Sequence, residues 1–152
     1  MTLPVDAFAI GVGATLGALS RHHAGRVTAE WIGTEPNRLG QFAGWHTAGI
    51  NIVGSFLLGG IAAIPVVPEL PASNHTTSPS MQFEGLLTPR TRLFFGVGFC
   101  GSFTTFSTYS VDVVTWLAEG KTMRAMSYMA ANNVGGIAAA ACGMSLAKKI
   151  FR

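Results

Sequence analysis

The chain has 152 residues, of which 49% are hydrophobic and only 11% are charged. Soluble domains carry about 25% charged residues and usually place a charged face on each helix, so a small apolar bundle in water is the less favoured interpretation. The formal charge is +3, but the basic residues are scattered along the chain, and this pattern gives no indication of nucleic-acid binding.

Four apolar stretches predict the fold. They cover approximately residues 5–24, 42–67, 92–118 and 122–147. Each is close to or above the ~20 residues that cross a bilayer as a helix. We therefore expect an all-α membrane protein, with one four-helix transmembrane domain over residues 1–152 and both termini on the same side. The longest connection, residues 68–89, is rich in Pro, Ser, Thr and Asn, which predicts a flexible loop.

Helix one ends with an intramembrane cation, and helix two carries a polar stripe. Arg21 lies near the end of the first stretch, and ionisable residues at such positions are functional candidates. In the second stretch Thr47, Asn51 and Ser55 recur every four residues and so share one face. Asn51 has two interpretations that the sequence leaves open. Its amide either joins two helices by a hydrogen bond or offers two N–H donors to an anion.

The third stretch contains the string GFCGSFTTFSTYS over residues 98–110, where glycines, hydroxyls and aromatic rings replace the usual aliphatic side chains. Irregular backbone at membrane depth is tolerated where it lines a cavity or is covered by protein. The string therefore predicts a broken helix beside a permeation path or binding site. The alternative for its aromatic rings is simple packing against a neighbouring helix.

Carboxylates are scarce within the predicted spans. No Glu lies deep in any of them, and Asp112, in the second half of the third stretch, is the single candidate for a proton carrier. This argues against a proton-coupled exporter, which needs an embedded carboxylate.

The ten Lys and Arg residues show no bias that would fix the orientation of the chain. With both termini on one side, half of them fall on each side: Arg90, Arg92, Lys148, Lys149 and Arg152 on one, and Arg21, Arg26, Arg38, Lys121 and Arg124 on the other. Such a chain either inserts in both orientations and forms an antiparallel homodimer, or has an orientation fixed by the position of its charges.

Three motifs resemble the Fluc (CrcB) family of fluoride channels. They are GVGATLGALSRH at residues 11–22, TAGINIVGSFLLG at residues 47–59 and GFCGSFTTFSTYSVD at residues 98–112. The resemblance covers all four predicted helices in order. It implies a third helix with a break and an antiparallel dual-topology homodimer.

The resemblance also implies roles for individual residues. Backbone carbonyls at the matching positions Gly101 and Thr104 would hold a structural sodium ion on the dimer axis. The residues that would line the pores or meet fluoride are Arg21, Asn51, Phe106, Ser107, Thr108, Tyr109, Tyr128 and Asn132. Two of these depart from the family pattern, because Tyr109 stands where a second Phe is usual and Asn132 where a Ser is usual.

The function implied by the resemblance is passive, selective export of fluoride across the inner (cytoplasmic) membrane by a multi-pass protein, which lowers cytoplasmic fluoride. Fluoride, the lipid bilayer and a second copy of the chain are the expected partners, and no enzyme activity is expected. Two alternatives remain: one subunit of a heterodimeric fluoride channel, and a small dual-topology multidrug exporter driven by protons.

Overall fold

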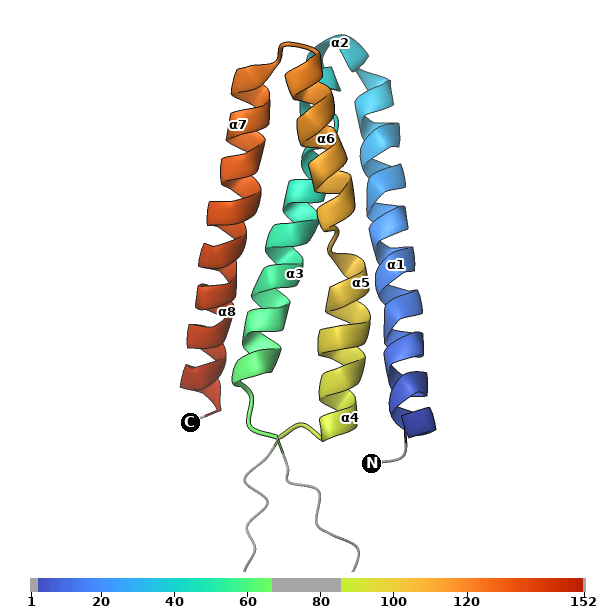
Figure 1. The fold of residues 1–152 in the computed structure, drawn as a ribbon, viewed down its shortest axis with the longest axis vertical. Coiled ribbons are helices and arrows are strands. Elements are labelled where there is room, and N and C mark those ends of the chain that lie inside the picture. The colour runs from blue at the N-terminus through green and yellow to red at the C-terminus, as the bar shows by residue number, and fades with distance from the viewer. Residues whose placement is uncertain (1–2, 67–85, 152) are drawn as a thin grey trace, which may run out of the picture.

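The computed structural model describes residues 3–66 and 86–151, and over these ranges the chain is helical apart from short links and one isolated bridge, Val66 to Leu87. This confirms the predicted all-α class. The helices run side by side along the molecule, and the first and last described residues lie at the same end (Figure 1). Most of the expected loop 68–89 falls outside the described residues, and its last residue already begins a helix.

Helix α1, Leu3–Thr34, runs well past the predicted end at residue 24. The prediction ended where the apolar composition ends. Helicity continues because no proline interrupts the chain before Pro36 and because Arg26 and Glu30, one turn apart, form an exposed ion pair of 3.1 Å. Two short elements, α2 (Pro36–Leu39) and η1 (Gly40–Phe42), then turn the chain back into the bundle.

Helix α3, Trp45–Ala63, is shorter at both ends than the predicted range 42–67. It begins after Gly44, which has φ of +84°, a left-handed conformation that favours glycine. It ends because Ile64 is extended, as the residue before a proline tends to be.

The third predicted stretch folds as a helix in two parts. The first part comprises α4 (Pro89–Arg92), the π-helical η2 (Leu93–Cys100) and α5 (Gly101–Phe103), and the second is α6 (Phe106–Ala118). The gap between α5 and α6 is visible near the middle of the molecule (Figure 1). The expected break is therefore present, and it falls at Thr104 and Thr105.

The last stretch begins after Gly120, whose φ of +73° forms the tight link from α6. It comprises α7 (Thr122–Ala130), the π-helical η3 (Ala131–Gly135) and α8 (Gly136–Ile150) in direct succession. π-Helical turns inside α-helices often occur at functional positions. Here the π turn contains both Asn132 and Asn133.

Glycines allow the helix backbones to approach closely. A Cβ at Gly59 would collide with the carbonyl of Ala140, and one at Gly143 with the carbonyl of Phe56, so α3 and α8 pack backbone to backbone. Gly17 on α1 faces the Phe99 carbonyl of η2 in the same way. Small residues allow such close packing in membrane proteins, where the hydrophobic effect does not drive helices together and van der Waals contacts must do so.

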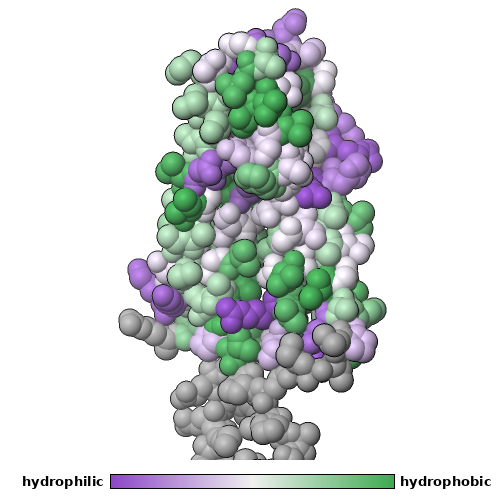
Figure 2. Space-filling model, in the orientation of Figure 1, coloured by the Kyte–Doolittle hydropathy of each residue, from purple (hydrophilic) through white to green (hydrophobic). Residues whose placement is uncertain are grey.

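Many large apolar side chains point outward. Among the described residues, α3 is the one continuous helix that is long and apolar enough to cross a bilayer by itself, and the others carry charges or are divided by breaks and π turns. Apolar side chains are nevertheless exposed along the length of the face that Figure 2 shows. Over the whole described surface they include Phe8, Val134 and Ile137, each more than two-thirds exposed. A surface of this kind is suited to lipid or to a second protein chain.

Candidate functional site

The break in the third predicted helix is the centre of the site. Thr104 and Thr105 adopt extended conformations, with ψ of 159° and 117°, between α5 and α6. Thr105 also caps α6, because its Oγ1 accepts a hydrogen bond from the Thr108 N–H at 3.3 Å. The N-terminus of a 13-residue helix therefore points at the break and gives it a positive electrostatic character.

Asn51 of α3 binds the exposed backbone of the break. The Thr105 N–H donates to Asn51 Oδ1 at 2.9 Å, and Asn51 Nδ2 donates to the Thr105 carbonyl at 3.2 Å. An N–H group can only donate, so this contact fixes which atom of the amide is the oxygen. The second hydrogen of Asn51 Nδ2 goes to Asn132 Oδ1 at 2.8 Å.

These contacts decide between the two interpretations of Asn51. Both of its N–H groups are used within the chain, so it joins α3 to the break and to η3 rather than offering free donors to an anion. Asn132 continues the connection, because its Nδ2 donates to the Tyr128 carbonyl at 3.0 Å. Within this chain the two asparagines thus form a frame that connects α3, the break and η3, and their role along an ion path stays a prediction.

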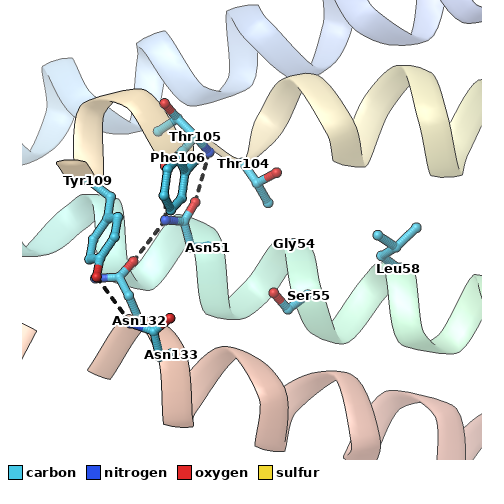
Figure 3. A pocket seen from close by; sticks show the side chains of 10 residues that line it. All are labelled: Asn51, Gly54, Ser55, Leu58, Thr104, Thr105, Phe106, Tyr109, Asn132 and Asn133. Carbon is cyan, nitrogen blue, oxygen red and sulfur yellow. Dashed lines mark hydrogen bonds between the residues drawn. The ribbon is translucent and has the colours of Figure 1, made fainter. Parts of the chain in front are cut away.

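A cavity of about 230 Å³ lies beside this frame (Figure 3). We call it the amide pocket; it is lined by Asn51, Gly54, Ser55, Leu58, Thr104, Thr105, Phe106, Tyr109, Asn132 and Asn133. It therefore brings together four of the predicted pore residues, namely Asn51, Phe106, Tyr109 and Asn132. Gly54 is required at its wall, because a Cβ there would collide with the Thr104 side chain.

Two aromatic rings stand on one side of the amide pocket. The centroids of Phe106 and Tyr109 are 5.6 Å apart, with the planes tilted by 47°. Phe106 is 77% exposed, and the Tyr109 hydroxyl accepts a hydrogen bond from Asn133 Nδ2 at 3.1 Å. Packing against a neighbouring helix, the alternative interpretation of the rings, does not describe Phe106 in this chain.

A second cavity, of about 390 Å³, lies on the other side of the break. We call it the basic cavity, because Arg21, His22, Arg26 and His46 are among its lining residues. Thr108 lines it too, and Thr105 lines both cavities. Arg21 reaches the break directly, since its Nη1 donates to the Thr104 carbonyl at 2.9 Å.

Two predicted pore residues lie elsewhere. Tyr128 has no exposed surface and packs with Trp45 and Trp116 in the core, and its hydroxyl donates to Asp112 Oδ2 at 2.9 Å. It lines neither the amide pocket nor the basic cavity, and its expected place in a path stays a prediction. Ser107 is exposed, with its hydroxyl 3.3 Å from that of Thr105.

The carbonyls predicted to hold a cation differ from each other. In a continuous helix the Thr105 N–H would donate to the Gly101 carbonyl, but here it donates to Asn51. The break thus frees the Gly101 oxygen, whereas the Thr104 oxygen accepts from Arg21. A carbonyl oxygen has two lone pairs, so Thr104 keeps one acceptor position.

Sequence reasoning missed Asn133 and gave Ser55 no role beyond the polar stripe. Ser55 lies one turn beyond Asn51, and its place in the stripe was a usable signal. Asn133 gave no such signal. In the structure Asn132 and Asn133 both belong to the π turn of η3, and both line the amide pocket.

Comparison with known proteins identifies the family. The family described as CrcB-like protein, Camphor Resistance (CrcB), matches residues 8–144. A Gloeobacter violaceus protein named fluoride-specific ion channel FluC is 34% identical over 139 residues, which cover 91% of this chain and 93% of the relative. Chlorobium phaeobacteroides (strain DSM 266) has a relative of the same name, 34% identical over 91% of this chain and 89% of its own length. A Moorella thermoacetica protein named fluoride-specific ion channel FluC 2 is 30% identical over 93% of this chain and 96% of its own length. Because the family match spans most of the chain, including the residues of both cavities and of the break between them, the chain belongs to the CrcB family.

Proposed function

We propose that this chain is a fluoride-selective ion channel that passively exports fluoride across the inner membrane and lowers its cytoplasmic concentration. The observation that carries the proposal is the amide pocket, a cavity lined by amide, hydroxyl and aromatic groups beside irregular backbone in an otherwise apolar helix. The names of the relatives identify the ion.

Fluoride holds its hydration shell tightly, so a narrow path must replace that shell with protein groups. Phe106 and Tyr109 offer ring edges, which carry partial positive charge, and Tyr109 and Ser55 offer hydroxyl hydrogens. The helix dipole at the N-terminus of α6 adds to the attraction. Asn51 and Asn132 hold the backbone of the break, from which α6 begins, through their hydrogen bonds.

The basic cavity is suited to collecting the anion before it reaches the break. Arg21 lines this cavity, and so does Arg26, whose charge is partly offset by its ion pair with Glu30. Clefts lined by one sign of charge raise the local concentration of the opposite ion. Thr105 is the common wall of the two cavities. Fluoride would therefore pass close to this residue on its way between them. A membrane potential that is negative inside drives the anion outward with about 2.3 kcal/mol per charge per 100 mV.

A structural sodium ion fits the break. Gly101 and Thr104 would hold it through backbone carbonyls, which suit a hard cation, and the Gly101 carbonyl is the one that the break releases from helical hydrogen bonding. When bound, the ion would supply positive charge near the anion path. Arg21 shares the Thr104 carbonyl and would supply charge beside it.

The proposed assembly is an antiparallel, dual-topology homodimer of multi-pass chains. Support comes from the even distribution of basic residues and from the outward-facing apolar side chains, above all Phe106, which is 77% exposed in one chain. A ring that is to narrow an ion path must be covered on its open side, and a second copy would provide that cover.

The test is fluoride efflux from liposomes that contain only this purified chain, read with a fluoride electrode, with chloride efflux measured in parallel. We expect fast fluoride release and negligible chloride release. Absence of fluoride release from well-folded dimers would overturn the homodimeric channel. Release restored by a second family member would then establish a heterodimer.

A further inference from the structure

A third cavity lies at the end of the bundle opposite the described termini, where α2 and η1 turn the chain back (Figure 1). We call it the elbow cavity; its volume is about 500 Å³, and Trp31, Glu35, Arg38 and Phe42 are among its lining residues. It shares no lining residue with the amide pocket or the basic cavity. The proposed function therefore gives it no role.

The elbow cavity lies at the level of lipid headgroups. Helix α3 has 19 residues and is about 28 Å long, which matches the ~30 Å hydrocarbon layer of a bilayer. A Cβ at Gly25 of α1 would lie 3.6 Å from His46 Nε2 at the start of α3, so Gly25 marks the edge of that layer. Trp31 is about 9 Å further along α1, and helical side chains lean back toward the N-terminus, here toward the membrane. The headgroup layer extends about 5–8 Å beyond the hydrocarbon, so the Trp31 ring reaches it.

The apolar wall of the elbow cavity is an aromatic pair. The ring centroids of Trp31 and Phe42 are 6.4 Å apart, and both rings remain exposed. Trp is enriched at membrane interfaces because its ring is apolar and its N–H is polar. Within residues 3–66 and 86–151 the Trp31 indole N–H has no hydrogen-bond partner, so it is available to an ester or phosphate oxygen.

The polar wall carries one charge of each sign. Arg38 Nη1 lies 3.7 Å from Glu35 Oε2, and both side chains are exposed. An exposed ion pair contributes little to stability, and in the described part of the chain it is the one polar contact that either side chain makes. Both groups can therefore turn to a ligand. They suit one that also carries both charges, with a phosphate for the guanidinium and an ammonium group for the carboxylate.

We propose that the elbow cavity binds the headgroup of a zwitterionic phospholipid from the surrounding bilayer. Arg38 binds the phosphate and Glu35 the ammonium group, while Trp31 and Phe42 lie against the glycerol and the upper acyl chains. An anionic headgroup would pair with Arg38 but would leave Glu35 beside a phosphate without a cation, so the charges favour the zwitterion. Such a site requires a bilayer around the bundle but no conduction, so its test is independent of the proposed function.

The test measures lipid binding to the purified full chain in detergent by native mass spectrometry. The chain is titrated with phosphatidylethanolamine or with phosphatidylglycerol, which differ in the ammonium group that Glu35 would bind. We expect the unmodified chain to bind phosphatidylethanolamine about three- to fivefold more tightly, as an exposed ion pair allows.

Glu35→Gln is the decisive variant, because it should change the two affinities in opposite directions. Loss of the carboxylate weakens binding of phosphatidylethanolamine about three- to fivefold, and loss of its repulsion strengthens binding of phosphatidylglycerol. Arg38→Gln should weaken binding of both lipids. Glu30→Gln and Arg26→Gln are the matched controls, because these two residues form an exposed ion pair of 3.1 Å on α1 and do not line the elbow cavity. Both controls should leave the affinity for phosphatidylethanolamine unchanged.

Three results would overturn the site: equal affinity of the unmodified chain for the two lipids, an unchanged affinity for phosphatidylethanolamine in Glu35→Gln, or an equal loss in Glu30→Gln. A soluble probe, glycerophosphoethanolamine, has the same headgroup without acyl chains. If it binds as tightly as the lipid, the site serves a soluble zwitterion and the assignment to the bilayer fails. The four substituted side chains are exposed, so folded protein is expected from every variant.

Discussion

Asn51 and Thr105, which lie 54 residues apart in sequence, exchange two hydrogen bonds, one in each direction. The side-chain amide of Asn51 has the same donor and acceptor as a peptide group, so it pairs with Thr105 as a neighbouring strand would. Thr105 is 9% exposed, and its backbone groups would otherwise lack partners in a buried setting. An interruption of the helix that would be costly in an apolar environment is stabilised in this way by a side chain from α3.

Removal of this amide should destabilise the fold and stop conduction. Asn51→Ala leaves the Thr105 N–H unpaired, which costs about 1–3 kcal/mol, and also releases Asn132. We expect a lower midpoint of thermal unfolding in detergent and loss of fluoride efflux. Ser55→Ala, one turn away on the same helix, is the matched control and should leave the midpoint nearly unchanged. Equal midpoints for the two variants would mean that Asn51 does not hold the break.

Phe106 should matter for conduction and little for the folding of one chain. Its side chain is 77% exposed, so Phe106→Ile removes few contacts within the chain. We expect fluoride efflux to be abolished while the thermal midpoint and the dimer peak in size-exclusion chromatography are retained. Phe8→Ile provides the control, because Phe8 lies on α1, is 72% exposed and does not line the amide pocket. The Phe8→Ile variant should therefore release fluoride as fast as the unmodified chain. Normal efflux through Phe106→Ile would place the path elsewhere.

The contact between α3 and α8 depends on Gly59. A Cβ at this position would collide with the backbone carbonyl of Ala140, which cannot move as a flexible side chain can. Gly59→Ala should therefore lower the stability by about 1–3 kcal/mol. Gly49→Ala on the same helix places its Cβ in open space and should have no such cost. Thermal unfolding of the two variants side by side makes the comparison, and a stable Gly59→Ala protein would show that the helices can separate slightly.

The sequence predicts the elements of this fold better than their ends. Apolar runs indicate where the helices are, and the string at residues 98–110 indicates the break, because both are local properties of composition. The extension of α1 to Thr34 was not predictable from hydropathy, since it depends on the absence of a proline between residue 24 and Pro36. The exact starts of α3 and α7 depend on two glycines with positive φ, which hydropathy does not report.

The partners of polar side chains were the least predictable part. Asn51 was correctly placed on a polar stripe, but its hydrogen bonds to residues 54 and 81 positions away are set by the packing of three elements. Tyr128 was predicted as a pore residue from the family resemblance, and its burial between Trp45 and Trp116 depends on packing that the sequence does not report. Asn133 lies in a π turn and lines the amide pocket, and no periodic pattern in the sequence indicated it.

Asp112 separates the channel from a proton-coupled exporter. Its Oδ2 accepts from the Tyr128 hydroxyl at 2.9 Å, so the carboxylate has a structural partner in the core. Asp112→Asn keeps an oxygen that accepts this hydrogen bond and removes the group that would carry a proton. For a channel we expect fluoride efflux within about twofold of the unmodified chain, because a neutral acceptor preserves most of the interaction.

Tyr128→Phe is the companion variant: it removes the same hydrogen bond but keeps the ring, so it measures how much of any change is structural. Efflux is compared with and without a pH gradient. An exporter would respond to the gradient in the unmodified chain and lose that response in Asp112→Asn, while Tyr128→Phe would retain it. A flux indifferent to the gradient in all three proteins is the result that passive conduction requires.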